Sequence, residues 1–232
     1  MTTIDSDCWK SVSEESLRFF GEMSASVSHE IRNKLAVINE KAGLVQDIAL
    51  AVKSGRALDP DRLEMQAGKI IDQVRQANRV VGVLNRLAHS VDAPRIRIDL
   101  ADLIGLMTEL YERKTAQAEI TISAVVSADP VSVITSPFLL AALIGACIDA
   151  AMPRVDDSRI MTIAAGAIAD GAAIRFQNLT GIEESDLEFG GQDTGARAML
   201  EMLGGRLAAD RQLGEFVLEI SNCAGPDGGS QP

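Results

Sequence analysis

Residues 17–52 read LRFFGEMSASVSHEIRNKLAVINEKAGLVQDIALAV, and their apolar side chains recur at steps of three, four and seven residues. Steps of this size place side chains on one side of an α-helix. The stretch therefore predicts a long helix with one apolar stripe, packed in a bundle. At 1.5 Å per residue, a helix of about 40 residues is about 60 Å long. The stripe consists of Leu17, Phe20, Val27, Ile31, Ile38, Ala42, Val45, Ala49 and Val52.

A second helix is expected after a short break. Residues 54–60 (SGRALDP) interrupt the pattern with Gly55 and Pro60, and Asp59 is placed to cap a helix that begins at Pro60. A second stripe then runs through Leu63, Ala67, Ile70, Val74, Ala77, Val81, Leu84, Ala88 and Val91. The two helices predict an antiparallel hairpin over residues 16–92. Because one hairpin leaves much of both stripes exposed, we expect a homodimer in which two copies form a four-helix bundle.

The remainder of the chain alternates between segments typical of strands and of helices. The strand-like segments are 95–98, 119–126, 160–167, 172–177, 206–210 and 215–221, and the helix-like segments are 100–113, 138–152 and 194–203. This order predicts an α+β class, with a sandwich of helices on a mixed sheet over residues 95–224. We expect an N-terminal tail over residues 1–15 and a disordered tail over residues 225–232.

Composition excludes several classes of function. The 232 residues carry 22 Lys and Arg against 33 Asp and Glu, a formal net charge of −11. Such a chain lacks the positive field with which proteins bind nucleic acids or anionic membranes. The longest apolar run, residues 137–148, is shorter than the roughly 20 residues that cross a bilayer, and the acidic N-terminus is not a secretory signal. Three widely spaced cysteines predict neither disulfides nor structural zinc, so we expect a cytoplasmic protein.

One of the two histidines, His29, is placed for chemistry. It lies two residues from Val27 and from Ile31, which puts it on the side of the first helix opposite the apolar stripe. A histidine with the ordinary pKa of about 6.5 is largely neutral near pH 7, and a neutral ring nitrogen is a nucleophile. Asn33 lies one turn further on the same face, and Glu30 is adjacent. On position alone, a solvated surface histidine is the simpler interpretation.

The string around His29 favours a chemical role. Residues 28–38, SHEIRNKLAVI, resemble the phosphoacceptor box of two-component sensor histidine kinases, roughly S-H-E-[LI]-R-[TN]-P-L-x-x-I, which lies on the first helix of an antiparallel hairpin. The resemblance implies that His29 is phosphorylated, that Glu30 is the acid/base beside it, and that Asn33 takes part in dephosphorylating the partner. Lys34 stands where the family usually has Pro, so we expect a straighter helix past the histidine.

The second half resembles the ATP-binding domain of the same family in its order of elements, but it differs where the family contacts nucleotide. Residues 141–151 overlay the asparagine box, and Ala142 and Ala146 replace two asparagines, the second of which holds Mg²⁺. Alanine offers no oxygen to that ion. Residues 177–182 overlay the adenine segment D-x-G-x-G-[IL], with Asn178 in place of the Asp. An amide accepts a hydrogen bond from the adenine amino group more weakly than a carboxylate does.

The phosphate-binding glycines also differ. Residues 190–198, GGQDTGARA, stand where the family has its lid and the glycines G-x-G-L, and the segment is several residues short. This sequence does not offer the open backbone nest that a triphosphate needs. Losing the metal ligand, the adenine acceptor and the phosphate loop together argues against ATP turnover. We expect no cofactor on this chain, with Mg²⁺ supplied by the partner's receiver domain.

Three functions are compatible with these features. The first is a dimeric histidine phosphotransferase of a phosphorelay, which carries a phosphoryl group between response-regulator aspartates through His29. The second is a histidine kinase with an atypical nucleotide site, and the third is a pseudokinase scaffold that binds a response regulator. The intact box counts against a scaffold, and the lack of a recognisable sensor or membrane segment counts against a kinase. We favour the phosphotransferase, whose partners are a second copy and receiver domains, with neither nucleic acid nor membrane.

Overall fold

The computed structural model describes residues 6–92, 94–125, 129–182 and 194–222. It divides into two compact units, which are described separately: Met23–Arg86 forms one, and Met1–Glu22 together with Leu87–Pro232 forms the other. The expected disordered tail and residues 190–193 of the expected lid lie outside the described residues.

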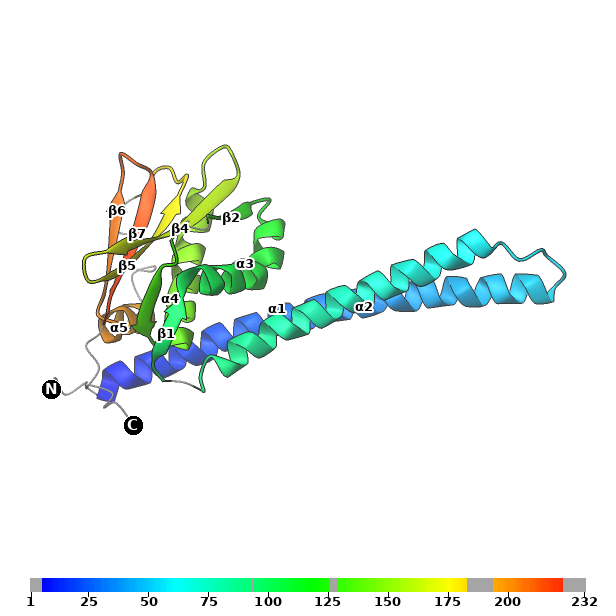
Figure 1. Ribbon diagram of the computed structural model, residues 1–232, viewed down its shortest axis with the longest axis horizontal. Helices are drawn as coiled ribbons and strands as arrows, with labels where there is room; N and C mark the ends of the chain where they lie inside the picture. The colour runs from blue at the N-terminus through cyan, green and yellow to red at the C-terminus, as the bar shows by residue number, and fades with distance from the viewer. Residues whose placement is uncertain (1–5, 93, 126–128, 183–193, 223–232) are drawn as a thin grey trace. The chain divides into compact units, whose positions relative to one another are not determined.

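Two long antiparallel helices form the hairpin, α1 (Ser6–Lys53) and α2 (Pro60–His89) (Figure 1). The start of α2 is as the sequence predicts, because the Asp59 carboxylate accepts a hydrogen bond of 3.1 Å from the Arg62 backbone N–H. The start of α1 differs from the expectation, since residues 6–15 of the expected tail are already helical. Helix α1 also continues without interruption past the box, as the absence of Pro predicts.

The seam between the two helices differs from the predicted stripes. The buried residues of the unit Met23–Arg86 are Met23, Val27 and Ile48 from α1, and Gln66 and Val83 from α2. Val74 and Val81, which belong to the predicted stripe of α2, are 43% and 44% exposed. Each helix therefore carries one row of apolar residues toward the other helix and a second row toward solvent. The single stripe predicted for each helix contained residues of both rows.

The second unit is built on a mixed sheet, as predicted. Five strands lie in the order β2 (Thr121–Val125), β4 (Ile160–Ile168), β5 (Gly171–Gln177), β7 (Glu215–Ser221) and β6 (Gly205–Asp210). Strand β2 pairs parallel to β4, and the other neighbours are antiparallel. A separate pair consists of β1 (Ile96–Asp99) and β3 (Ser132–Thr135), which are antiparallel. Strand β3 was not predicted, although four of the five residues 131–135 are β-branched.

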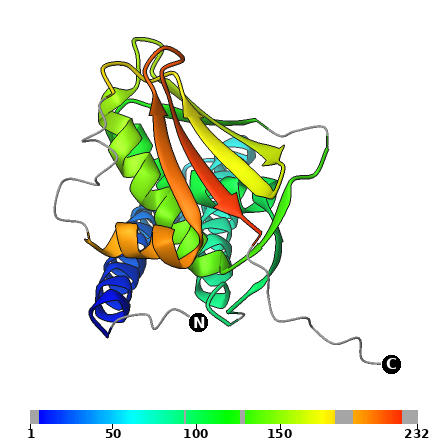
Figure 2. The same cartoon turned by 90° about the vertical axis from the view of Figure 1, so that its left-hand side faces the viewer.

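Helices α3 (Leu100–Gln117) and α4 (Pro137–Ala151) pack on the five-stranded sheet, and α5 (Thr194–Met202) packs beside α4 (Figure 2). The core between them is apolar and fully enclosed. Its largest members include Met107, Leu140, Ile144, Met161, Ile163, Phe176 and Phe216. Residues Pro137–Arg154 are long and apolar enough to cross a membrane by composition, but 61% of that window is buried inside the domain as its central helix. The α+β class and the order of its elements are thus confirmed.

Candidate functional site

The box on α1 presents two parallel pairs of side chains, each four residues apart. The first pair is exposed: the Asn33 side-chain amide nitrogen lies 3.2 Å from Nδ1 of His29. The structure therefore brings these two predicted site residues together on the solvent side of the helix. An exposed imidazole on a rigid helix is accessible to a partner protein, and its neighbour one turn away fixes the orientation of the ring.

The contact between Asn33 and His29 also bears on which ring nitrogen can react. If the amide donates, Nδ1 is the acceptor and the ring proton is on Nε2. If the amide is turned so that its oxygen faces the ring, Nδ1–H donates and the lone pair of Nε2 is free. Only the second arrangement leaves Nε2 able to attack a phosphoryl group. Asn33 is thus a residue that can select the reactive tautomer of His29.

The second pair is Glu30 and Lys34, and it involves the other helix. The Lys34 ammonium lies 3.7 Å from Glu30 Oε1 and donates a hydrogen bond of 2.9 Å to the side-chain carbonyl of Gln76 on α2. The Glu30 and Lys34 side chains are each only 24% exposed, so the pair is half-buried. Among the interactions of the described residues, Glu30 therefore pairs with Lys34, while His29 pairs with Asn33. The resemblance implied that Glu30 lies beside the His29 ring, and no pattern in the sequence pointed to Gln76 as a partner of Lys34.

The described residues hold no cluster of three or more His, Cys, Asp or Glu that could bind a metal ion. The second histidine, His89, is exposed at the end of α2, and its Nδ1 lies 2.8 Å from the Asp92 carboxylate. That pair lies at the end of the helix and includes no residue of the box.

The first 17 helical residues of α1 cover the helix that overlays the asparagine box. The Phe19 and Phe138 rings meet edge to face, and a Cβ at Gly145 would lie 2.8 Å from the Phe19 ring. Phe138 and Gly145 are seven residues apart and share one face of α4 with Ala142, which is 3% exposed. The position of the first box asparagine is therefore covered by the chain's own helix.

The residue that overlays the adenine-binding Asp is also engaged elsewhere. Asn178 has a positive φ of 67°, and its amide nitrogen donates to the carbonyl of Ile160 at 3.0 Å and to the Thr162 hydroxyl at 3.2 Å. Both partners belong to the start of β4. The Asn178 side chain thus holds the end of β5 to the neighbouring strand, a structural role that leaves its amide nitrogen occupied.

The described end of the lid segment packs tightly. A Cβ at Gly195 would lie 2.4 Å from the Cβ of Glu15 and 3.0 Å from the Ser11 carbonyl oxygen, and Ala196 is fully buried. The start of α5 is therefore pressed against the first turns of α1. A backbone packed in this way has no room for a phosphate between the two helices.

A polar cluster that the sequence did not single out joins α3 to α4. The Tyr111 hydroxyl donates to Asp149 Oδ2 at 3.2 Å, and the Lys114 ammonium donates to Asp149 Oδ1 at 2.6 Å. Burial, followed by the charge of Asp149, raises the pKa of Tyr111 above its ordinary value. Burial also raises the pKa of the Cys147 thiol, consistent with a small core residue and not a reactive one.

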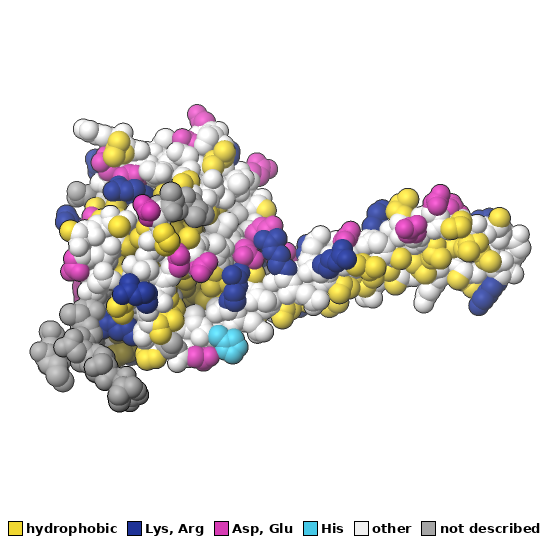
Figure 3. Space-filling view, viewed as in Figure 1, with side chains coloured by type: hydrophobic (Ala, Val, Ile, Leu, Met, Phe, Trp, Pro, Cys, Tyr) yellow, Lys and Arg dark blue, Asp and Glu magenta, His cyan; other side chains and the backbone are white. Residues whose placement is uncertain are grey.

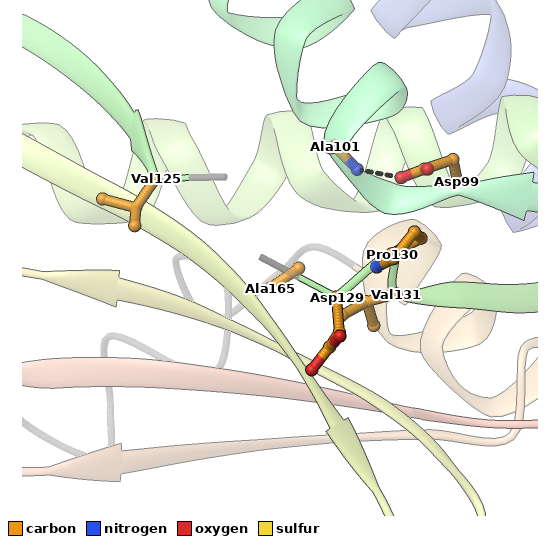
Figure 4. Close-up of a pocket in the computed structure, with 7 residues that line it drawn as sticks. All are labelled: Asp99, Ala101, Val125, Asp129, Pro130, Val131 and Ala165. Carbon is orange, nitrogen blue, oxygen red and sulfur yellow. Dashed lines mark hydrogen bonds between the residues drawn. The ribbon is translucent and has the colours of Figure 1, made fainter. Parts of the chain in front are cut away.

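A cavity of about 100 Å³ lies in the sheet domain where the start of α3 meets β2 and β4 (Figure 4). Its lining is Asp99, Ala101, Val125, Asp129, Pro130, Val131 and Ala165. Asp99 serves as the N-cap of α3, since its carboxylate accepts a hydrogen bond of 2.8 Å from the Ala101 N–H. None of the residues that overlay the nucleotide boxes lines this cavity.

No protein-family model matches the sequence, and no curated protein matches it. Solved structures with which the chain shares similarity include the following three, each with a TM-score below 0.5. A histidine kinase of Acinetobacter baumannii, AdeS, shares 17% identity, with 79% of this chain and 95% of that chain covered and a TM-score of 0.47. The ATP-binding domain of PrrB from Mycobacterium tuberculosis shares 15% identity (57% and 100% covered, TM-score 0.43). The catalytic domain of the histidine kinase ThkA shares 14% identity (56% and 97% covered, TM-score 0.45). At 14–17% identity, these are similarities of fold alone.

Proposed function

We propose that the protein is a histidine phosphotransferase of two-component signalling, which relays a phosphoryl group between response-regulator aspartates through His29. The observation that carries the proposal is the exposed His29–Asn33 pair within an intact phosphoacceptor box. An acceptor that is exposed on a helix is open to a partner protein, and the exposure of both His29 and Asn33 supports this role.

The sheet domain supports transfer without ATP. Three positions at which the resemblance places nucleotide contacts are altered: Ala146 replaces the asparagine that holds Mg²⁺, Asn178 replaces the Asp that accepts from adenine, and Gly195 is packed on α1. Each change would weaken nucleotide binding. The domain is then a structural and docking element, and the phosphoryl group comes from another protein.

Phosphoryl transfer between an aspartate and a histidine requires few catalytic groups on this chain. The phosphoryl group leaves the carboxylate oxygen of an aspartyl phosphate and forms a bond to Nε2 of His29, and the reverse step delivers it to a second aspartate. Such transfers proceed in line and depend on positioning and on charge neutralisation. The Mg²⁺ belongs to the acidic pocket of the receiver domain, so this chain needs no metal ligand. The contribution of this chain is a ring presented at a fixed place on α1, beside an Asn33 amide whose orientation decides which ring nitrogen is free.

The test is transfer from a phosphorylated receiver domain. Incubation with a receiver labelled at its aspartate is expected to move the label onto this protein as an acid-labile, base-stable phosphohistidine. The His29→Gln variant is expected to accept none while it keeps its fold, because the residue is exposed. The matched control is His89→Gln, the other exposed histidine, which is expected to accept label at the parental rate. Labelling of the His29→Gln protein would place the acceptor elsewhere and overturn the proposal.

A further inference from the structure

We propose that Lys34 is a positioning residue that holds the Glu30 carboxylate away from the His29 ring, so that Asn33 alone orients the ring at rest. The effect of Lys34 on the rate of phosphoryl transfer rests on the proposed function, whereas the pairing of Glu30 with Lys34 is a feature of the free protein. The resemblance to the family had given Glu30 the role of acid/base beside the histidine. The contacts on α1 and α2 give it a different partner.

The arrangement restrains Glu30 from two sides. Glu30 and Lys34 are one helical turn apart in the favourable order, with the acid toward the N-terminus. The Lys34 ammonium is in turn anchored by the Gln76 side chain at 2.9 Å, which ties the pair to the other helix. Both charged side chains are only 24% exposed, so water competes for the pair less than at an open surface. For Glu30 to bond to His29, it must give up its ion pair with an ammonium that is hydrogen-bonded to Gln76.

A carboxylate that bonds to one nitrogen of an imidazole makes the other nitrogen more basic and holds its tautomer. A carboxylate that is tied to Lys34 supplies neither effect. At rest the ring of His29 therefore has a neutral amide as its partner, and the Glu30 carboxylate stays paired with Lys34. Lys34 stands where the pattern that the box resembles usually has Pro, a residue without an ammonium to form such a pair.

The first experiment needs no phosphate. Nitrogen-15 NMR of the uniformly labelled full chain reports the tautomer and hydrogen bonding of the two histidine rings. The His89→Gln variant lacks one of the two sets of ring resonances, so it assigns the other set to His29. In the parent, Glu30→Gln is expected to leave the His29 ring resonances unchanged. In a Lys34→Met background, which keeps the length of the side chain and removes the charge, Glu30→Gln is expected to shift them. The matched control background is Lys41→Met, which removes a lysine seven residues further along the same helix whose ion-pair partner is Glu40. In that background, Glu30→Gln is expected to leave the His29 ring resonances unchanged, as in the parent.

The second experiment measures the rate of label transfer from a phosphorylated receiver. Lys34→Met is expected to accelerate acceptance about two- to fivefold, the factor that an ion pair of this kind can withhold, and Lys34→Met/Glu30→Gln to return to the parental rate. Should Lys34→Met not fold, Gln76→Met removes only the anchor and is expected to show the same pattern more weakly. An equal response of the His29 resonances to Glu30→Gln in the parent and in Lys34→Met would overturn the positioning role. The expected NMR pattern with no transfer in any variant would keep that role and refute the phosphotransferase.

Discussion

The Phe19 ring near the start of α1 and the Phe138 ring at the start of α4 meet edge to face, with centroids 6.0 Å apart and planes at 67°. Phe19 is 5% exposed, and its ring also fills the space beside Gly145. The first turns of α1 are therefore part of the core of the sheet domain. The chain thus uses for packing the face of α4 that carries Phe138 and Gly145.

The first prediction concerns this contact. Phe19→Ala is expected to lower the free energy of unfolding of the sheet domain by about 3–5 kcal/mol, because it removes a buried ring and leaves a cavity. Urea unfolding followed by circular dichroism measures the loss. Lys10→Ala, on the exposed side of the same segment, is the control and is expected to stay within about 0.5 kcal/mol of the parent. An equally small loss for Phe19→Ala would show that the segment does not pack on α4.

The second prediction is that Mg-ATP does not bind. A ligand at 5 mM with a dissociation constant near 50 μM would stabilise the protein by about 2.7 kcal/mol, a shift in Tm of several degrees. No shift is expected, because Ala146 offers no oxygen to Mg²⁺, an amide at Asn178 accepts from adenine more weakly than a carboxylate, and the start of α5 is packed on α1. A working histidine kinase domain under the same conditions is the positive control. A clear shift, or label on the protein from ATP, would favour the kinase instead.

The third prediction is a dimer built on the hairpin. Figure 3 shows hydrophobic side chains exposed along the hairpin. The exposed members within Met23–Arg86 include Leu35, Leu50, Val52, Leu58, Met65, Ile71, Val74 and Val81. Light scattering at micromolar concentration is expected to give twice 24.7 kDa. Val81→Glu is expected to dissociate the dimer, because a carboxylate buried between apolar helices is costly.

The control for the dimer is Arg75→Glu, which places a carboxylate on a side chain that is 76% exposed and should leave the mass unchanged. A folded monomer in the parent at the same concentration would refute the dimer. Loss of the dimer in both variants would point to net charge and not to the apolar face.

Part of this structure could be predicted from the sequence, and there is a physical reason why the rest could not. The two long helices, the Asp59 cap and the alternation of strands and helices apart from β3 depend on neighbours within a few residues, and these predictions are confirmed. The link from Lys34 to Gln76 joins residues 42 apart in the chain. Whether a glutamate bonds to the histidine beside it or to a lysine one turn away depends on such a distant anchor, which no local pattern reports.

The same limit applies to the sheet domain. Substitution of Asp by Asn at position 178 can be seen in the sequence, but its new bonds to Ile160 and Thr162 depend on how β4 and β5 pair. The early start of α1 was missed because residues 6–19 are mostly polar, and only Val12 and Phe19 among them are buried. Two buried side chains in 14 residues are too few to form a periodic pattern.

The last prediction uses Tyr111, the only tyrosine in the chain. Burial, then the charge and hydrogen bond of Asp149, raise its pKa in the folded state above the ordinary value of about 10. A raised folded-state pKa means that the unfolded chain loses this proton first. The stabilisation is therefore complete below about pH 10 and is lost as the pH rises further, at up to about 1.4 kcal/mol per pH unit.

Urea unfolding at several values from pH 8 to pH 11 tests this for the parent and for Tyr111→Phe, which shares every other titrating group. The free energy of unfolding of the parent is expected to fall more steeply above pH 10 than that of the variant. At pH 8 the variant is expected to be less stable by about 1.5 kcal/mol, because it loses the 3.2 Å hydrogen bond to a charged acceptor. Absorbance at the phenolate band follows this one side chain directly. Ionisation in the folded protein with a midpoint near pH 10 would contradict the burial of Tyr111 between α3 and α4.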